Sequence, residues 1–209
     1  MTTDPQTDDH ITSAILSGST YEQVRYQRHS FLRQSVPRTL MLQSALLGLL
    51  VVLLPMYGLF PTSVAGFLPT TDPAAASPKV LLLGIFGGLL ELFGATLLAG
   101  SALYRVRSAS LTEAQAHRVL DVEDFARYVG LGTGGLAILL TLAVFAVGLG
   151  GDAAVSSYVE VAGANPFVDS GLGLPVVAVS LTAFVASIAV FYAGGYLSVR
   201  LSQVRKRGQ

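Results

Sequence analysis

The chain has 209 residues, of which 52% are hydrophobic and only 12% are charged. A soluble domain averages about 25% charged residues, so this composition indicates a membrane protein. The formal net charge is zero and there is no cysteine, which excludes disulfides, thiolate metal sites, iron–sulfur ligation and a thiol nucleophile.

The first 38 residues are polar and precede any long apolar stretch. Residues 1–18 are acidic and without periodicity, which predicts a disordered tail, and they lack the pattern of a cleavable signal peptide. Residues 19–38 open with the capping-box pattern Ser-Thr-Tyr-Glu and predict a short juxtamembrane amphipathic helix. Its arginines and apolar side chains fit either a helix lying on anionic headgroups or an ordinary basic segment beside the membrane.

Four apolar stretches are long enough to cross a bilayer as helices, since about 20 residues at 1.5 Å each span the hydrocarbon core. They predict an all-α membrane protein, with four transmembrane helices in a bundle within residues 39–199 and a basic tail at 200–209. The spans are expected at about 39–60, 80–104, 127–149 and 175–198.

The second span carries small residues and one carboxylate on a single helical face. Glu91 lies about 17 Å from the start of this span by helical rise, which is near the midplane. The small residues form a GxxxG pair and a second small-xxx-small pair, which in membranes permit close helix packing. This helix-packing face consists of Gly84, Gly88, Ala95 and Ala99.

An ionised carboxylate at the midplane costs at least about 2.5 kcal/mol, so Glu91 should be protonated, paired or hydrated. No basic residue lies in the interior of a predicted span. Three interpretations stay open: a neutral carboxyl bonded to a neighbouring helix, a carboxylate on a proton or cation path, and a carboxylate neutralised by a partner subunit. Depth alone places Thr141 and Ser187 level with Glu91, as candidate hydrogen-bond neighbours.

The loop after the second span predicts a short helix near residues 111–119, followed by an acidic stretch. We interpret Asp121, Glu123 and Asp124 as the start of the third helix, where acids favour the helix dipole, in preference to a cation site. Four glycines at the beginning of the third span predict another close helix contact. They are Gly130, Gly132, Gly134 and Gly135.

The positive residues concentrate on one side of the predicted membrane. Twelve of the 13 Lys and Arg residues fall in or beside the N-terminal segment, the loop between the second and third spans, and the tail, four in each, and only Lys79 lies on the other side. Because positive residues favour the cytoplasmic side, we predict that both termini are cytoplasmic. A short similarity between the ends of spans two and four leaves a parallel repeat of two hairpins open.

Sequence signatures of known chemistry are absent. The three histidines lie outside the spans, there is no HExxH, GxSxG or Walker A sequence, and the basic residues flank the membrane. We therefore expect no enzymatic site, no cofactor or metal and no nucleic-acid partner, with an enzyme site in a loop as a minor alternative. The favoured hypothesis is a non-enzymatic assembly or accessory subunit of a membrane complex, embedded in the lipid bilayer and oligomeric through its small-residue face. The alternative is a small proton- or cation-coupled transporter that uses Glu91.

Overall fold

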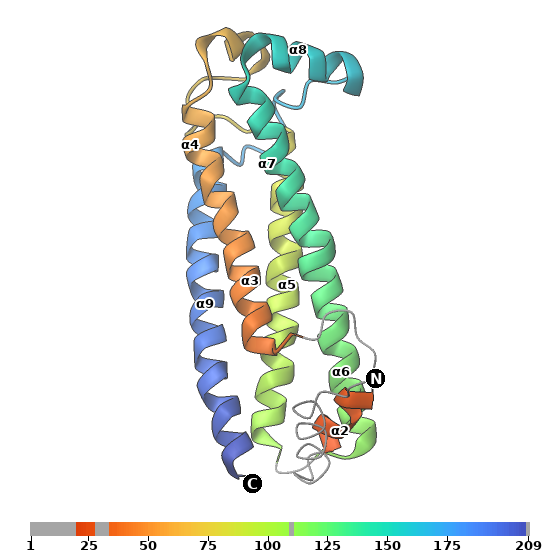
Figure 1. Cartoon of the computed structure of the whole chain (residues 1–209). Helices are drawn as coiled ribbons and strands as arrows, with labels where there is room; N and C mark the ends of the chain where they lie inside the picture. The colour runs from red at the N-terminus through yellow and green to blue at the C-terminus, as the bar shows by residue number, and fades with distance from the viewer. Residues whose placement is uncertain (1–19, 28–33, 109–110, 208–209) are drawn as a thin grey trace, which may run out of the picture.

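The computed structural model describes residues 20–27, 34–108 and 111–207, and these residues form an elongated helical bundle (Figure 1). No strand is found among them, apart from one isolated bridge between Pro78 and Asp169. The helical elements in chain order are α2 (Thr20–Gln27), α3 (Val36–Leu49), η1 (Leu50–Val52), α4 (Leu53–Gly58), η2 (Thr62–Phe67), α5 (Val80–Arg107), α6 (Glu113–Arg127), η3 (Tyr128–Gly134), α7 (Gly135–Leu149), α8 (Gly151–Ala162) and α9 (Val176–Arg207).

The helical elements include four long helical rods, each long and apolar enough to cross a membrane. The protein is therefore an all-α integral membrane protein. Two rods combine several elements, since α3, η1 and α4 are continuous and so are α6, η3 and α7. The candidate spans are Val36–Gly58, Val80–Arg107, Glu113–Leu149 and Val176–Gln203.

The third rod begins far earlier than the sequence indicated. Its first residue is Glu113, capped by Thr112, whose side chain accepts from the Gln115 backbone while the Gln115 side chain accepts from the Thr112 backbone. Neither glycine nor proline interrupts the chain from there to Val129, so the helix continues into the membrane. Interpreting the acidic stretch 121–124 as a helix start was therefore wrong, because these acids lie well inside the helix.

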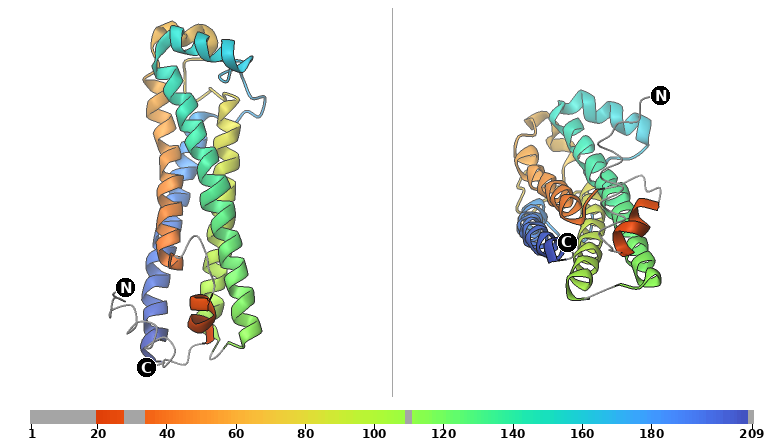
Figure 2. Two further views of the ribbon diagram at one scale, coloured as in Figure 1. Left: turned by 45° about the vertical axis from the view of Figure 1, so that its right-hand side comes forward. Right: turned by 60° about the horizontal axis from the view of Figure 1, so that its bottom comes forward.

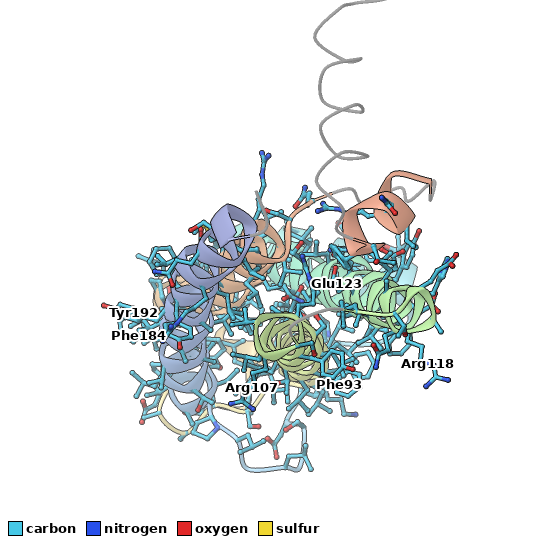
Figure 3. The ribbon with its side chains drawn as sticks, turned by 90° about the horizontal axis from the view of Figure 1, so that it is seen from below. Phe93, Arg107, Arg118, Glu123, Phe184 and Tyr192 are labelled. Carbon is cyan, nitrogen blue, oxygen red and sulfur yellow. The ribbon has the colours of Figure 1, made fainter. Side chains whose placement is uncertain are left out.

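The helices α3 and α5 form the centre of the bundle. Both pack against α9, and α5 also packs along η3 and α7 (Figures 1 and 2). Only 22% of the apolar window of α9 is buried, the lowest share of the four spans, so α9 lies at the periphery. Figure 3 shows Phe184 and Tyr192 pointing outward from it, as expected for side chains that face lipid.

One end of the bundle carries α8 (Figure 1), and aromatic side chains pack together in this half of the molecule. The Phe145 ring is fully buried there, 5.9 Å from the Phe60 ring and 6.1 Å from the Phe167 ring between centroids. Leu53, Leu81 and other apolar side chains complete this hydrophobic core. This half of the bundle therefore has the dry interior of a soluble protein core.

At the opposite end, which also holds the last turns of α9, α2 lies beside α6 (Figure 1). Tyr21 and Val24 of α2 are buried against Ala116, Val119 and Leu120 of α6. One of the two sequence hypotheses placed this segment on lipid headgroups and the other made it an ordinary basic segment; the described part of α2 packs its apolar side on protein. The predicted disordered tail at 1–18, and the stretch 28–33 of the expected juxtamembrane helix, lie outside the described residues.

Replacing Phe145 by Ala should lower the stability of the bundle. The change removes a fully buried ring and leaves a cavity, for which losses of about 3–5 kcal/mol are typical. Phe184→Ala is the matched control, because half of this side chain is exposed on the lipid side of α9. Thermal unfolding in detergent should show a large drop in Tm for the first variant and a small one for the second; equal drops would contradict the packing.

Candidate functional site around an intramembrane carboxylate

Glu91 is fully buried at the middle of α5. Its carboxyl group faces η3 and the start of α7, where Oε1 lies 3.5 Å from the position that a Cβ on Gly135 would occupy. The sequence analysis placed Glu91 near the midplane on the small-residue face of the second span, and the structure buries this residue. A buried carboxyl at membrane depth is costly unless its surroundings satisfy it, so its neighbours decide its chemistry.

Gln43 of α3 is the polar neighbour of Glu91. It is fully buried, and its amide Nε2 lies 2.8 Å from the Cβ position of Gly94 on α5. The same amide contacts the Cβ position of Gly130, which lies 3.2 Å from Glu91 Oε2. The carboxyl and the amide therefore share one small space, which exists because Gly94 and Gly130 have no side chains. We call Gln43, Glu91 and these two glycines the Glu91 site.

Backbone-to-backbone contact between α5 and η3 frames this space. A Cβ on Gly87 would stand only 2.7 Å from the Gly134 carbonyl oxygen, and one on Gly134 would stand 2.9 Å from the Gly87 carbonyl oxygen. Further along, a Cβ on Gly94 would stand 2.8 Å from the Ala126 carbonyl oxygen. Real Cβ atoms do not approach so closely, so glycine is required for this helix contact.

The helix opposite Glu91 is not a regular α-helix. Tyr128–Gly134 forms a π-helix inside the otherwise continuous third rod. Such segments are rare and occur often at functional sites, because the wider turn alters the hydrogen-bond ladder. Gly130 and Gly134 are buried in it, whereas Gly132 is exposed. The predicted close contact by glycines at 130–135 therefore involves Gly130, Gly134 and Gly135 but not Gly132.

Unpartnered polar atoms collect in this part of the bundle. Among the described residues, six buried side-chain N or O atoms lack a hydrogen-bond partner: Gln34 Oε1, both polar atoms of Gln43, both carboxyl oxygens of Glu91, and Arg127 Nε. The Gln43 amide lies within hydrogen-bonding range of the Glu91 carboxyl, but its orientation falls short of full hydrogen-bond geometry. Each such atom typically costs about 1–3 kcal/mol, and native proteins contain few. This clustering is the most unusual feature of the interior.

A second buried carboxylate, Glu123 of α6, has the opposite character because every side of it is satisfied. Its Oε2 accepts from the Tyr21 hydroxyl at 2.8 Å and from Arg127 Nη2 at 3.2 Å. Its Oε1 accepts from Arg105 Nη1 and from Ser101 Oγ, both at 3.4 Å. We call these five residues the Glu123 cluster. Figure 3 places Glu123 in the interior near α5, whereas Arg107 and Arg118 point outward at the rim.

Tyr21 closes the Glu123 cluster from the α2 side. The Arg105 guanidinium carbon lies 3.5 Å from the centroid of the Tyr21 ring, a cation–π contact. Burial, reinforced by the negative charge of Glu123, raises the pKa of the Tyr21 phenol well above its usual range. The phenol therefore keeps its proton and donates it in the hydrogen bond to Glu123.

Arg127 of the Glu123 cluster lies near the Glu91 site along the third rod. Its guanidinium also bonds Asp124 Oδ1 at 2.8 Å and the Gln34 carbonyl oxygen at 3.2 Å. Arg127 precedes Gly130 by three residues, which is close to one turn of helix. The acidic stretch interpreted as a helix cap thus supplies ion pairs, and the described residues contain no group of three His, Asp or Glu side chains suited to a metal.

The hydroxyl neighbours predicted from depth are not partners of Glu91. Thr141 donates to the Ala137 carbonyl oxygen at 2.8 Å and packs on Gly84, and Ser187 donates to the Ser44 carbonyl oxygen at 2.8 Å. Neither Glu91 oxygen has a hydrogen-bond partner in the structure. The prediction was wrong because depth does not determine which face of a helix points toward a neighbour.

The predicted helix-packing face lies largely inside the molecule. A Cβ on Gly84 would contact Thr141 and Leu50, and one on Gly88 would contact Leu50 at 3.2 Å. Ala95 is buried in the central core, and Ala99 packs partly against that core. These residues therefore bring helices of the same chain together.

Sequence reasoning missed Gln43, Gly87, Gly94 and the pairing of Glu123 with Arg127. Gln43 could have been noted as the single amide in the interior of the first span. The acid–base pair had a signal as well, since residues four apart face each other on a helix. The prediction of a separate helix start concealed that spacing.

Comparisons with protein-family models, curated proteins and solved structures found no match for this chain.

Gly130→Ala should destabilise the protein, because the added methyl group collides with the Gln43 amide and crowds Glu91. We expect a loss of about 1–3 kcal/mol, as for other overpacked sites. Gly132→Ala is the control: nothing lies within 4 Å of its Cβ position, and neither glycine has positive φ. Thermal unfolding should lower Tm for the first variant only, and a Gly130 variant as stable as the control would contradict the crowded geometry.

Proposed function

We propose that the protein is a small, non-enzymatic membrane transporter in which Glu91 binds and releases the coupling proton or cation. One observation carries the proposal: four of the six unpartnered buried polar atoms among the described residues belong to Glu91 and to its neighbour Gln43. A purely structural carboxyl would be expected to bond a neighbouring helix, because that contact removes the energetic penalty. An ionisable group that stays unsatisfied at membrane depth is better explained by a ligand that comes and goes.

We infer an orientation from charge. The basic residues lie at the end where α2 and the last turns of α9 are found, including Arg105, Arg107 and Arg118, whereas Lys79 and several acids lie at the α8 end. Positive residues favour the cytoplasmic face, so the α2 end and both termini are assigned to the cytoplasm.

Glu91→Gln should abolish proton-coupled activity while leaving the fold intact, since the amide is isosteric but cannot release a proton. The probe is proton flux into liposomes that contain the purified protein and a pH-sensitive dye, driven by an imposed potassium diffusion potential. Wild-type protein should carry flux and the variant should not. A carboxyl stretching band that titrates in the infrared spectrum, and that the variant lacks, is the independent readout.

Glu113→Gln is the control for that experiment, because its side chain is 77% exposed at the rim and remote from the membrane interior. It should leave both flux and the titrating band unchanged. Equal flux in wild-type and Glu91→Gln protein, with no titrating carboxyl band, would contradict the proposed function.

A second candidate is an assembly subunit, favoured by a groove on the outer side of the bundle between α5 and α9. Its volume is about 220 Å³, and its lining is apolar. Small side chains, among them Gly88, Ala178 and Ala186, line it and would let another helix approach closely. Its proposed occupant is a transmembrane helix of a partner protein, which would meet Gly88 of the small-residue face here, whereas Gly84 packs against Thr141 and Leu50 inside the chain.

Thr182→Trp should dissociate such a partner, because Thr182 is exposed in the groove and the indole would fill it. Val185→Trp is the matched control, on the exposed side of α9 but outside the groove. Native mass spectrometry of protein extracted gently from its own membrane should report a complex for wild type and control, and the isolated chain for Thr182→Trp. A complex that survives in all three would overturn the groove as a docking site, and a wild-type chain carrying only lipid would overturn the assembly role.

A further inference from the structure

We propose that the Glu91 site is hydrated and exchanges protons, not metal cations, with the α2 end of the bundle through the Glu123 cluster. This inference rests on the proposed role of Glu91 and adds a route and a ligand class to it. Four observations support it: the positions of the unpartnered polar atoms, the apolar packing at the α8 end, the short distance along the third rod between the two polar sites, and the chemical kinds of the unpartnered atoms.

The unpartnered atoms extend in one direction only. Starting from Glu91 and Gln43, the others belong to Gln34 and Arg127. Both lie toward α2, since Gln34 accepts from Arg25 and Arg127 shares Glu123 with Tyr21. Thr39 continues the polar face of α3 between Gln43 and Gln34, and it is fully buried. Buried polar groups of this kind are commonly satisfied by internal water, each water binding about three of them.

The interior toward α8 offers no comparable path. The side chains that fill it include Leu81, Ile138 and Phe145, all fully buried. The buried hydroxyls described in that half have partners within the chain: Thr141 bonds the Ala137 carbonyl oxygen, and Ser180 bonds the Leu50 carbonyl oxygen. A proton moving in that direction would meet a packed apolar core, where desolvation is costly.

The Glu91 site and the Glu123 cluster are joined by α6 and η3. Gly130 borders the Glu91 carboxyl, and Arg127, almost one turn away, bonds Glu123 at 3.2 Å. The Arg127 guanidinium and the Gln34 carbonyl oxygen are themselves bonded at 3.2 Å. Polar groups therefore occur at intervals from the Glu91 site to the phenol of Tyr21, which donates to Glu123.

The unpartnered atoms include both acceptors and donors of hydrogen bonds. Four are oxygens of Gln34, Gln43 and Glu91, whereas Arg127 Nε and Gln43 Nε2 are N–H groups that need an accepting oxygen. Water can serve both kinds of atom, whereas a metal cation would serve only the oxygens. The charged groups along this route are Arg25 on α2, Arg105 on α5, and Arg127, Glu123 and Asp124 on α6, and Arg105 and Arg127 pair with these carboxylates. A metal ion would have to carry its charge past these guanidinium groups, whereas a proton is relayed along hydrogen bonds.

The absence of cysteine makes the route directly testable by thiol labelling. Single cysteines are introduced at Gln43, Glu91 and Thr39, with Thr141→Cys as the matched control that is equally buried but on the α8 side. A charged, membrane-impermeant methanethiosulfonate is then applied to either face of oriented vesicles. Only a thiol in contact with water ionises and reacts, so labelling reports hydration.

We expect the three cysteines on the route to react from the α2 face, about tenfold faster than from the α8 face, and the Thr141 cysteine to react from neither. Tyr21→Ala should increase these rates because it uncovers the Glu123 cluster, whereas Tyr128→Ala, at an exposed tyrosine near the same end, should not. The Thr39→Cys variant keeps Glu91 and Gln43 intact, so it still tests the route if the other two cysteine variants fail to fold.

Labelling from the α8 face, or none from either face in protein that unfolds at the wild-type temperature, would overturn the route. These results are separable from the proposed function. Proton flux that depends on Glu91, together with labelling from the α8 face, would support the transport function but contradict the proposed route. Labelling from the α2 face without such flux would support a hydrated site but contradict the transport function. Flux of sodium ions through the wild-type protein, blocked by Glu91→Gln, would overturn the restriction to protons.

Discussion

The close contact between α5 and η3 is the constraint on which the rest of the interior depends. Gly87 and Gly134 bring the two backbones so near that no side chain fits between them. In lipid, where helices gain little from expelling water, such packing is the main force that holds a bundle together. It also leaves side-chain space only at the flanks of the contact, and Glu91 and Gln43 occupy one of these flanks.

The two buried carboxylates differ in how the protein compensates their charge. Glu123 is surrounded by two arginines, a phenol and a hydroxyl, so its charge is compensated inside the chain. Removing one partner of such a buried pair typically costs about 3–5 kcal/mol, which makes the cluster a rigid element. Glu91 has an uncharged amide beside it and no cation among its described contacts. Its charge state can therefore change without breaking an ion pair, which suits a group that binds and releases a ligand.

Much of the architecture could be predicted from the sequence because bilayer thickness imposes a length on apolar helices. Three of the four spans agree closely with the predicted stretches, and the buried position of Glu91 followed from the small residues on its face. The start of the third rod could not be predicted, since the ends of a helix depend on competing caps, and Thr112 was the one used. Gln43 was not predicted as a neighbour because contacts across helices depend on rotation about each axis, which hydropathy does not report.

The π-helix at Tyr128–Gly134 has a consequence for how the third rod presents its faces. A π-turn accommodates more residues than an α-turn, and one extra residue corresponds to a rotation of about 100° in a helix of 3.6 residues per turn. Because of this rotation, the polar side of α6 and the apolar side of α7 both face the same helix, α5. A deletion of one residue in this segment would restore a regular helix and turn one half away from its partner, so chain length here is as much a part of the site as residue identity.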